Sequence, residues 1–460
     1  MVKAAPAPAG RYGWYVVFVL IIAYTFSYID RTILTLMVAP IRASLHISDV
    51  ELSLLHGLAF AVFYTVLGIP IGRLVDRRRR TTIVAVGVAL WSIMTALGGL
   101  ARSFGQMFVA RIGVGVGEAA LSPAAYSMLS DWFEGKALTR ALSLYSAAIY
   151  MGGGLALMAG GTLISHVAAI PMPSWIFGAG DIEPWRKVFI LVGLPGLAVA
   201  LLVLTLREPP RRGVTDAAIP AFREVLTYLR DRDAAYGWLI IGLCFASVMW
   251  NGVAAWVPSH FIRNYGWDAA DVGLRYGAAL FVFGTAGILS GGWIAGRWRD
   301  AGHSDANLRI GIVSALAALP FGVAAMLVND DWTCLGLLCP FLFAGAMPYG
   351  AAAAAFQEIT PNRMRGQISA IYLFALNLAG IGLGPTIAAL LTEHVFGGDA
   401  SVRWSLAMLI AVAAPLSALS LWRACAPYRR ALADIAGAMD LYAGDLSDPP
   451  DCANTAAQTR

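Results

Sequence analysis

The stretch Gly68-Ile-Pro-Ile-Gly-Arg-Leu-Val-Asp-Arg-Arg-Arg-Arg80 decides the fold, because an apolar run ends there in a cluster of arginines. Arginines that directly follow an apolar run are typical of a helix leaving a bilayer on its inner side. A shorter copy, Gly-Trp-Ile-Ala-Gly-Arg, covers residues 292–297 and starts 220 positions after Gly72. Since both copies follow an apolar run, they predict two parallel halves of similar build.

The composition on either side of these copies is that of a membrane protein. Of the 460 residues, 58% are hydrophobic and 13% are charged, and the mean hydropathy is +0.68, whereas soluble domains carry about 25% charged residues. A bilayer core takes about 20 apolar residues per helix. Twelve such runs lie near residues 14–38, 52–72, 82–101, 104–129, 139–166, 187–206, 236–258, 270–296, 309–328, 334–357, 367–395 and 403–425. We therefore expect an all-α membrane protein with twelve transmembrane helices in two six-helix bundles.

The distribution of Lys and Arg predicts the orientation. With the N-terminus inside, 24 of the 33 basic residues fall on the inner side and six on the outer side, which places both termini in the cytoplasm. The net charge of +5 is thus a topology signal and predicts no nucleic-acid partner. The expected division is a cytoplasmic N-terminus (1–13), a first bundle (14–206), a cytoplasmic linker (207–235), a second bundle (236–425) and a cytoplasmic tail (426–460).

Patterns that predict enzymatic or cofactor chemistry are weak in this chain. The five cysteines have no paired spacing, so we expect neither disulfides nor a metal site. The Gly-x-Gly string at 115–117 does not follow a strand and predicts no dinucleotide site, and no cofactor is expected. His394 and Asp399 match an acyltransferase spacing, but roughly a quarter of such a match is expected by chance, and the pair lies at an outer helix end. A membrane enzyme is accordingly the less favoured hypothesis.

The fourth run carries the sharpest candidate site, Arg111-Ile-Gly-Val-Gly-Val-Gly-Glu118-Ala119. Arg111 and Glu118 are seven residues apart and share one helix face, roughly 10 Å from each other. A charge at mid-bilayer costs at least about 2.5–3.5 kcal/mol, which favours a cavity or a charged partner. We interpret Glu118 as a group for both proton coupling and substrate binding and Arg111 as a substrate-binding group, and keep a purely structural ion-pair network as the alternative. Gly113 and Gly117 form a step that predicts helix packing.

The first run contributes a second charged pair, Asp30-Arg31. Asp30 lies at about the same depth as Arg111, so we expect the two to pair and assign Asp30 to proton coupling. Arg31 is turned about 100° from Asp30; it either borders the same cavity, as a substrate-binding group, or faces a neighbouring helix. His56 is expected to be a hydrogen-bonded core histidine rather than a proton relay.

The second half is predicted to be mainly apolar within its spans. Its only charged residue there is Arg275, which either extends its side chain to the outer surface or has a role that the sequence leaves open. The polar and aromatic candidates for substrate binding are Trp250, Asn251, Tyr349, Tyr372 and Asn377.

These motifs together resemble the spinster branch of the major facilitator superfamily. The resemblance rests on the pattern at 111–119, Ser-Pro-Ala-Ala-Tyr at 122–126, the pair Asp30-Arg31, and Gly382-Leu-Gly-Pro385. The stretch 68–80 is similar to the signature loop of the superfamily, which implies a gating role for Gly72, Asp76 and Arg77. This sequence has Arg79 where the family has Gly, and Gly296 where the second copy should have Asp. For the arginines at 78–80 we favour simple anchoring at the inner surface.

The resemblance implies a secondary transporter that works by rocking of two halves. Spinster-like proteins transport lysolipids and sphingoid phosphates, some with protons, so a lipid-like substrate and proton coupling are implied here. Related symporters of small organic anions also carry Asp-Arg in the first helix and provide the alternative. We expect a monomer in a bacterial inner membrane.

Overall fold

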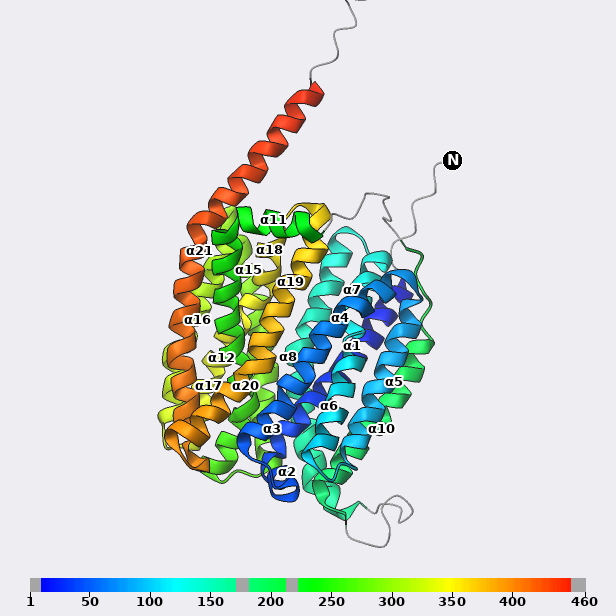
Figure 1. The fold of residues 1–460 in the computed structure, drawn as a ribbon, viewed down its shortest axis with the longest axis vertical. Coiled ribbons are helices and arrows are strands. Elements are labelled where there is room, and N and C mark those ends of the chain that lie inside the picture. Colours follow the sequence, from blue (N-terminus) through cyan, green and yellow to red (C-terminus); the bar gives the residue numbers. More distant parts are fainter. Residues whose placement is uncertain (1–9, 171–181, 212–221, 448–460) are drawn as a thin grey trace, which may run out of the picture.

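The computed structural model describes residues 10–170, 182–211 and 222–447, and its secondary structure in these ranges is entirely helical. Two bundles stand side by side in Figure 1, one coloured blue through cyan to the green of α10 and one coloured green through yellow to red. We call residues 11–206 the N half and residues 222–447 the C half. The start of α1 and the end of α21 lie at the same end of the molecule as α11, and this is termed the linker end; the opposite end is the far end.

The N half contains six membrane-crossing segments, several of them interrupted. Its elements are α1 (Arg11–Thr32) with a 3-10 turn η1 (Ile33–Leu36), α2 (Val38–Leu45), α3 (Asp49–His56), α4 (Leu58–Arg77), α5 (Arg80–Gly98), α6 (Phe104–Glu118), α7 (Leu121–Trp132), α8 (Gly135–His166) with a 3-10 turn η2 (Val167–Ala169), and α10 (Pro184–Leu204).

The C half repeats this plan. Its elements are α11 (Phe222–Asp231), α12 (Asp233–Tyr265), α13 (Ala269–Asp271), the π-helical η3 (Val272–Tyr276), α14 (Gly277–Ala279), the π-helical η4 (Leu280–Gly284), α15 (Thr285–Asp300), α16 (Ala306–Leu327), α17 (Asp331–Ala346), α18 (Pro348–Glu358), the 3-10 turn η5 (Asn362–Met364), α19 (Arg365–Asn377), the π-helical η6 (Leu378–Leu383), α20 (Gly384–Leu390), the π-helical η7 (Leu391–Phe396), the 3-10 turn η8 (Asp399–Ser401) and α21 (Val402–Ser447).

The twelve-helix prediction is confirmed. Eleven segments of the described chain are long and apolar enough to cross a membrane. The twelfth, around the predicted run 104–129, is divided into α6 and α7, each too short to cross alone. Two features differ from the expectation: the short helix α2 was not predicted, and α21 continues without a break through the expected boundary at 425 to Ser447.

The two halves are packed tightly against each other toward the far end. The largest buried apolar cluster contains residues of both halves, among them Leu36 of the N half and Trp256 of the C half. Glycines allow the close approach, because a Cβ on Gly161 would lie 3.0 Å from the Cα of Gly273. Small residues of this kind let helix backbones touch within a membrane.

Candidate functional site

Three helices of the N half are interrupted where its charged residues lie. Helix α1 tightens into a 3-10 turn after Thr32, the α3–α4 segment is broken at Gly57, and α6 ends at Glu118. Breaks of this kind expose backbone carbonyls inside the span, which is tolerated only where protein or a water-filled cavity surrounds them. The sequence predicted one continuous helix across 104–129, so the position of Glu118 at a helix end is a structural finding.

Glu118 forms an ion pair with Arg31, a partner on α1. The Nε of Arg31 donates to Glu118 Oε2 at 2.6 Å, and the hydroxyl of Ser27 donates to the same oxygen at 2.6 Å. The Glu118 side chain is fully buried, whereas that of Arg31 is 22% exposed. The structure therefore decides between the two predicted positions of Arg31: it borders the site.

Aromatic rings hold the guanidinium of Arg31 in place. Its Cζ lies 4.4 Å from the ring centre of Phe60 and about one ångström further from the rings of Tyr28 and Tyr64. Phe60 and Tyr64 are stacked on successive turns of α4. A guanidinium over aromatic faces keeps a favourable electrostatic contact without water. Arg31 is thus the charged group of this site that is both fixed and accessible.

The predicted ion pair between Asp30 and Arg111 is wrong. Arg111 donates instead to two backbone carbonyls, those of Asp30 and Leu55, each at 3.2 Å. Both carbonyls lie in the last turn of an interrupted helix, where such groups lack intrahelical partners and favour a cation. The prediction that Asp30 and Arg111 lie at the same depth agrees with this contact. The direction in which their side chains point depends on the helix breaks. Arg111, only 2% exposed, is mainly a cap for α1 and α3.

The carboxylates of the site are incompletely satisfied. Asp30 is 2% exposed and Glu118 is 1% exposed. In the described part of the chain, Oδ1 of Asp30 and Oε1 of Glu118 are buried without a hydrogen-bond partner. The two carboxylates, Arg31 and Arg111 are close enough to act on one another electrostatically. A buried acceptor without a donor is a position where a proton or a donor group of a substrate is stabilised.

Small residues bring α6 close to its neighbours. A Cβ on Gly115 would lie 2.7 Å from the carbonyl oxygen of Phe60, and one on Gly117 would lie 2.6 Å from that of Gly87. The packing role predicted for Gly113 and Gly117 is confirmed, since both face α5. The close packing therefore places α6 against α4 and α5, and Glu118 at the end of α6 contacts Ser27 and Arg31 of α1.

His56 ends α3 directly before the break at Gly57. Its Nε2 is buried and has no hydrogen-bond partner among the described residues. The expectation of a hydrogen-bonded core histidine is therefore wrong for this nitrogen.

The C half contributes aromatic residues at the interface between the halves. Trp250 and Tyr349 both pack edge-on against Tyr150 of α8, with ring centres 5.6 and 5.8 Å away. Tyr349 follows the break between α17 and α18. Tyr150 is a contact from the N half that sequence reasoning missed.

The other predicted residues of the C half have different surroundings. Asn251 donates to the carbonyl of Ser247 at 2.9 Å on its own helix. Asn377 is half-buried at the end of α19. Tyr372 is stacked on Phe356 with ring centres 3.9 Å apart and belongs to the apolar core at the linker end. The substrate-binding role predicted for Tyr372 is not supported by this position.

The predicted gating residues lie at the linker end of α4. A Cβ on Gly72 would meet nothing within 4 Å, so Gly72 makes no close helix approach in this structure. Arg77 is exposed, and the side chain of Asp76 lies outside the described part of the chain.

Arg80 is a buried junction, and the expectation that it is a surface anchor is wrong. It forms ion pairs with Asp131 and Glu208 and donates to the hydroxyl of Ser127 at 2.9 Å. Burial alone would raise the pKa of Glu208, but hydrogen bonds from Arg80 and from the backbone of Thr81 hold that pKa below its ordinary value. Arg80 thereby ties α5, α7 and the segment after α10 together.

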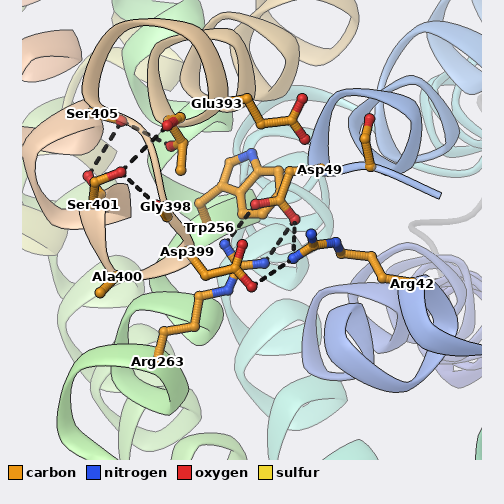
Figure 2. A network of polar contacts seen from close by, with 12 residues as sticks. Arg42, Asp49, Trp256, Arg263, Glu393, Gly398, Asp399, Ala400, Ser401 and Ser405 are labelled. Atoms are coloured by element: carbon orange, nitrogen blue, oxygen red, sulfur yellow. Dashed lines mark hydrogen bonds and ion pairs between the residues drawn. The ribbon is translucent and has the colours of Figure 1, made fainter. Parts of the chain in front are cut away.

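Charged residues of both halves meet at the far end, as Figure 2 shows. Asp49 accepts two hydrogen bonds from Arg263 of α12, at 2.6 and 2.7 Å. Arg42 of α2 lies 3.2 Å from Asp49 and donates to Asp399 at 2.9 Å. The backbone N–H of Val50 donates to Glu393 at 3.0 Å. We call Arg42, Asp49, Arg263, Glu393 and Asp399 the far-end network.

Sequence reasoning missed this network. Arg42 and Arg263 are two of the six basic residues that the topology prediction places on the outer side, and Asp399 was considered only within an acyltransferase pattern. One local signal was present: Ser48 and Glu51 form a capping box that starts α3 at Asp49, three residues before the predicted start.

Arg275 also lies at the far end. It pairs with Asp271 at 2.8 Å and lies over Trp267 and Trp332, which supports the prediction that its side chain extends to the outer surface.

A two-half bundle with a charged cluster at interrupted helices defines a polytopic membrane transporter. The chain belongs to the Major Facilitator Superfamily, whose family model matches residues 20–385. It is therefore a transporter and not an enzyme. Spinster-like architecture is also shown by the comparison with solved structures.

Three similar proteins illustrate the range of this family. An "MFS-type efflux pump" of Mycolicibacterium smegmatis is 28% identical over 91% of this chain and 94% of its own length. A "Probable L-galactonate transporter" of Escherichia coli is 26% identical over 60% of each protein. The crystal structure of a bacterial homolog of the human lysosomal transporter Spinster, inward-facing and unoccupied, matches with a TM-score of 0.75 and 27% identity over 92% of this chain and 97% of that chain.

Proposed function

We propose that this transporter moves an anionic or zwitterionic amphiphile, a lysolipid or a sphingoid-phosphate-like molecule, together with protons. The observation that supports this most is the pair Arg31–Glu118, in which an accessible guanidinium is joined to a buried carboxylate. An anionic head group that binds Arg31 competes with Glu118 for the same cation. Once displaced, a buried carboxylate is costly as an ion and takes up a proton.

The contrast between the two halves supports an amphiphilic substrate. Arg31, Glu118 and Asp30 all belong to the N half, whereas Trp250 and Tyr349 present aromatic surface from the C half. A molecule with one charged end suits this division. Arginine binds phosphate through charge-assisted hydrogen bonds, and each CH₂ group removed from water adds up to about 0.8 kcal/mol.

A small organic anion is the second candidate. It is favoured by the similarity to a protein named as a galactonate transporter and by the same Arg31, which binds a carboxylate as readily as a phosphate. In this case the aromatic residues serve only for packing between the halves.

The two candidates predict different dependence on chain length. For a lipid-like substrate, uptake into proteoliposomes and thermal stabilisation should increase along a series of single-chain phospholipids and sphingoid phosphates. Tyr349→Ala should weaken the response to long chains more than to short ones. If sugar acids and dicarboxylates are transported and the lipids are not, the lipid proposal is refuted and the organic-anion function replaces it.

We infer that the linker end is cytoplasmic and that the structure is inward-facing in a bacterial inner membrane. The basic residues around α11 and after α4 support the orientation. The far-end network supports a closed outer side, as does the similarity to an inward-facing structure.

A membrane-impermeant thiol reagent, added to sealed cells, should therefore miss Cys452, which lies outside the described residues. It should label Ala400→Cys, an exposed far-end position; the reverse pattern would overturn the orientation.

A further inference from the structure

A groove on the C half at the linker end combines apolar surface with three arginines. It has a volume of about 860 Å³ and is formed by the end of α15, the start of α16 and the adjoining turns of α21. This volume lies within the range of small-molecule sites, about 300–1,000 Å³. None of the groove-lining residues belongs to the site around Glu118, so the groove is a separate feature.

A buried carboxylate fixes two of the arginines. Asp305 accepts from Arg309 at 2.7 Å and from Arg429 at 2.8 Å, and its side chain is 2% exposed. Burial alone would raise the pKa of Asp305, but these two arginines hold that pKa below its ordinary value. Arg309 and Arg429 are 41% and 49% exposed. A guanidinium has five N–H donors, so each keeps donors beyond the one that Asp305 accepts.

The third arginine and two tryptophans complete the groove. Arg423 lies over the ring of Trp238 at 5.0 Å. Trp298 and Trp422 line the groove, and Trp422 is 65% exposed on the outer face of α21. Tryptophan is enriched at the level of lipid head groups, where one side of the ring is apolar and the other is wet. The tryptophans thus place the three arginines at the depth of lipid phosphates.

We propose that this groove binds an anionic phospholipid of the leaflet at the linker end. Its phosphate contacts Arg309, Arg423 and Arg429, and one acyl chain lies along Val313 and Trp422. Three arginines face one carboxylate, so the groove favours an anion, and basic pockets between membrane helices are typical sites for anionic head groups. The apolar surface distinguishes a lipid from free phosphate, which would use the arginines alone.

The test measures thermal stabilisation of the purified protein in detergent by phosphatidylglycerol. Phosphatidylcholine, glycerol phosphate and inorganic phosphate serve as comparison ligands. Arg423→Gln and the double variant R423Q/R429Q, which leaves Arg309 to hold Asp305, should weaken binding of phosphatidylglycerol by about fivefold per arginine. Arg297→Gln is the matched control, because Arg297 is an exposed arginine of α15 at the same end that stacks on Trp293.

The outcomes are distinct. Selective loss of the phosphatidylglycerol effect in R423Q/R429Q, with Arg297→Gln unchanged, supports the site. Equal stabilisation by phosphatidylcholine, equal loss in Arg297→Gln, or full activity of inorganic phosphate refutes a phospholipid site. Arg31→Gln, which removes the guanidinium proposed to bind the transported head group, should retain the effect; if it removes stabilisation, the lipid occupies the transport site and the proposed groove is refuted.

Discussion

Glu118→Gln is expected to abolish the dependence of transport on a pH gradient while leaving substrate exchange without a gradient in place. Glutamine keeps the shape of the side chain and an oxygen that accepts from Arg31 and Ser27, but it cannot bind or release a proton. The partner of Arg31 is then an amide, whose charge does not change when a proton is available. The substrate still finds the guanidinium, so counterflow continues, but proton movement is no longer coupled to it.

The measurement compares uptake driven by an imposed pH gradient with counterflow in the same proteoliposomes. The free energy of unfolding should fall by only about 1–3 kcal/mol, the cost of weakening a buried hydrogen-bonded contact, so the variant remains testable. Glu224→Gln is the control, because Glu224 is an exposed carboxylate on α11. Retained pH dependence in Glu118→Gln contradicts the coupling role, and loss of counterflow together with driven uptake indicates a structural role instead.

The architecture of this protein could be predicted from its sequence because it follows from length and periodicity. Twelve apolar runs require twelve crossings whatever the neighbours do, since a backbone in lipid must satisfy its own hydrogen bonds. The resemblance of residues 111–119 to a known family pattern likewise pointed to Glu118. Both inferences depend on short stretches of chain and not on tertiary contacts.

The partners of the charged residues could not be predicted in the same way. Depth along a helix follows from counting residues, but the facing direction of Asp30 and Arg111 depends on where α1 and α3 are interrupted. Those breaks are tertiary features: a Cβ on Gly57 would lie 2.9 Å from the carbonyl oxygen of Gly382 in the other half. The position of the Arg31 side chain could not be predicted for the same reason, because its contact with Glu118 depends on the packing of α6 on α4.

The far-end network was beyond sequence reasoning because its members come from opposite halves. Asp49 and Arg263 are 214 positions apart, and Arg42 and Asp399 are 357 apart. Each residue alone has the character of an ordinary charge at a helix end. Only the packing of the halves shows that they form a closed connection.

Asp49→Asn should open the far end and make an outward-facing arrangement dominant. The Asp49 side chain is 1% exposed and that of Arg263 is 10% exposed, so the pair is buried in the present state. Removal of one partner from a buried ion pair costs about 3–5 kcal/mol, because the remaining charge is left uncompensated. In the open state Arg263 regains water, so this cost falls mainly on the closed state. A tenfold change in an equilibrium corresponds to about 1.4 kcal/mol, which gives a shift of at least about 100-fold.

Distances between spin labels at Gly105→Cys and Gly336→Cys, in a chain with the native cysteines replaced, measure this opening. Both positions are exposed at the far end, one in each half, and an added Cβ meets nothing within 4 Å. Asp49→Asn should lengthen the distance, and Arg263→Gln should do the same. The double variant should be no more open than either single one, because a shared contact is lost only once. Arg275→Gln breaks an ion pair at the same end but within the C half, and it should leave the distance unchanged. If the distance lengthens in Arg275→Gln, or does not lengthen in Asp49→Asn, the far-end network does not hold the halves together.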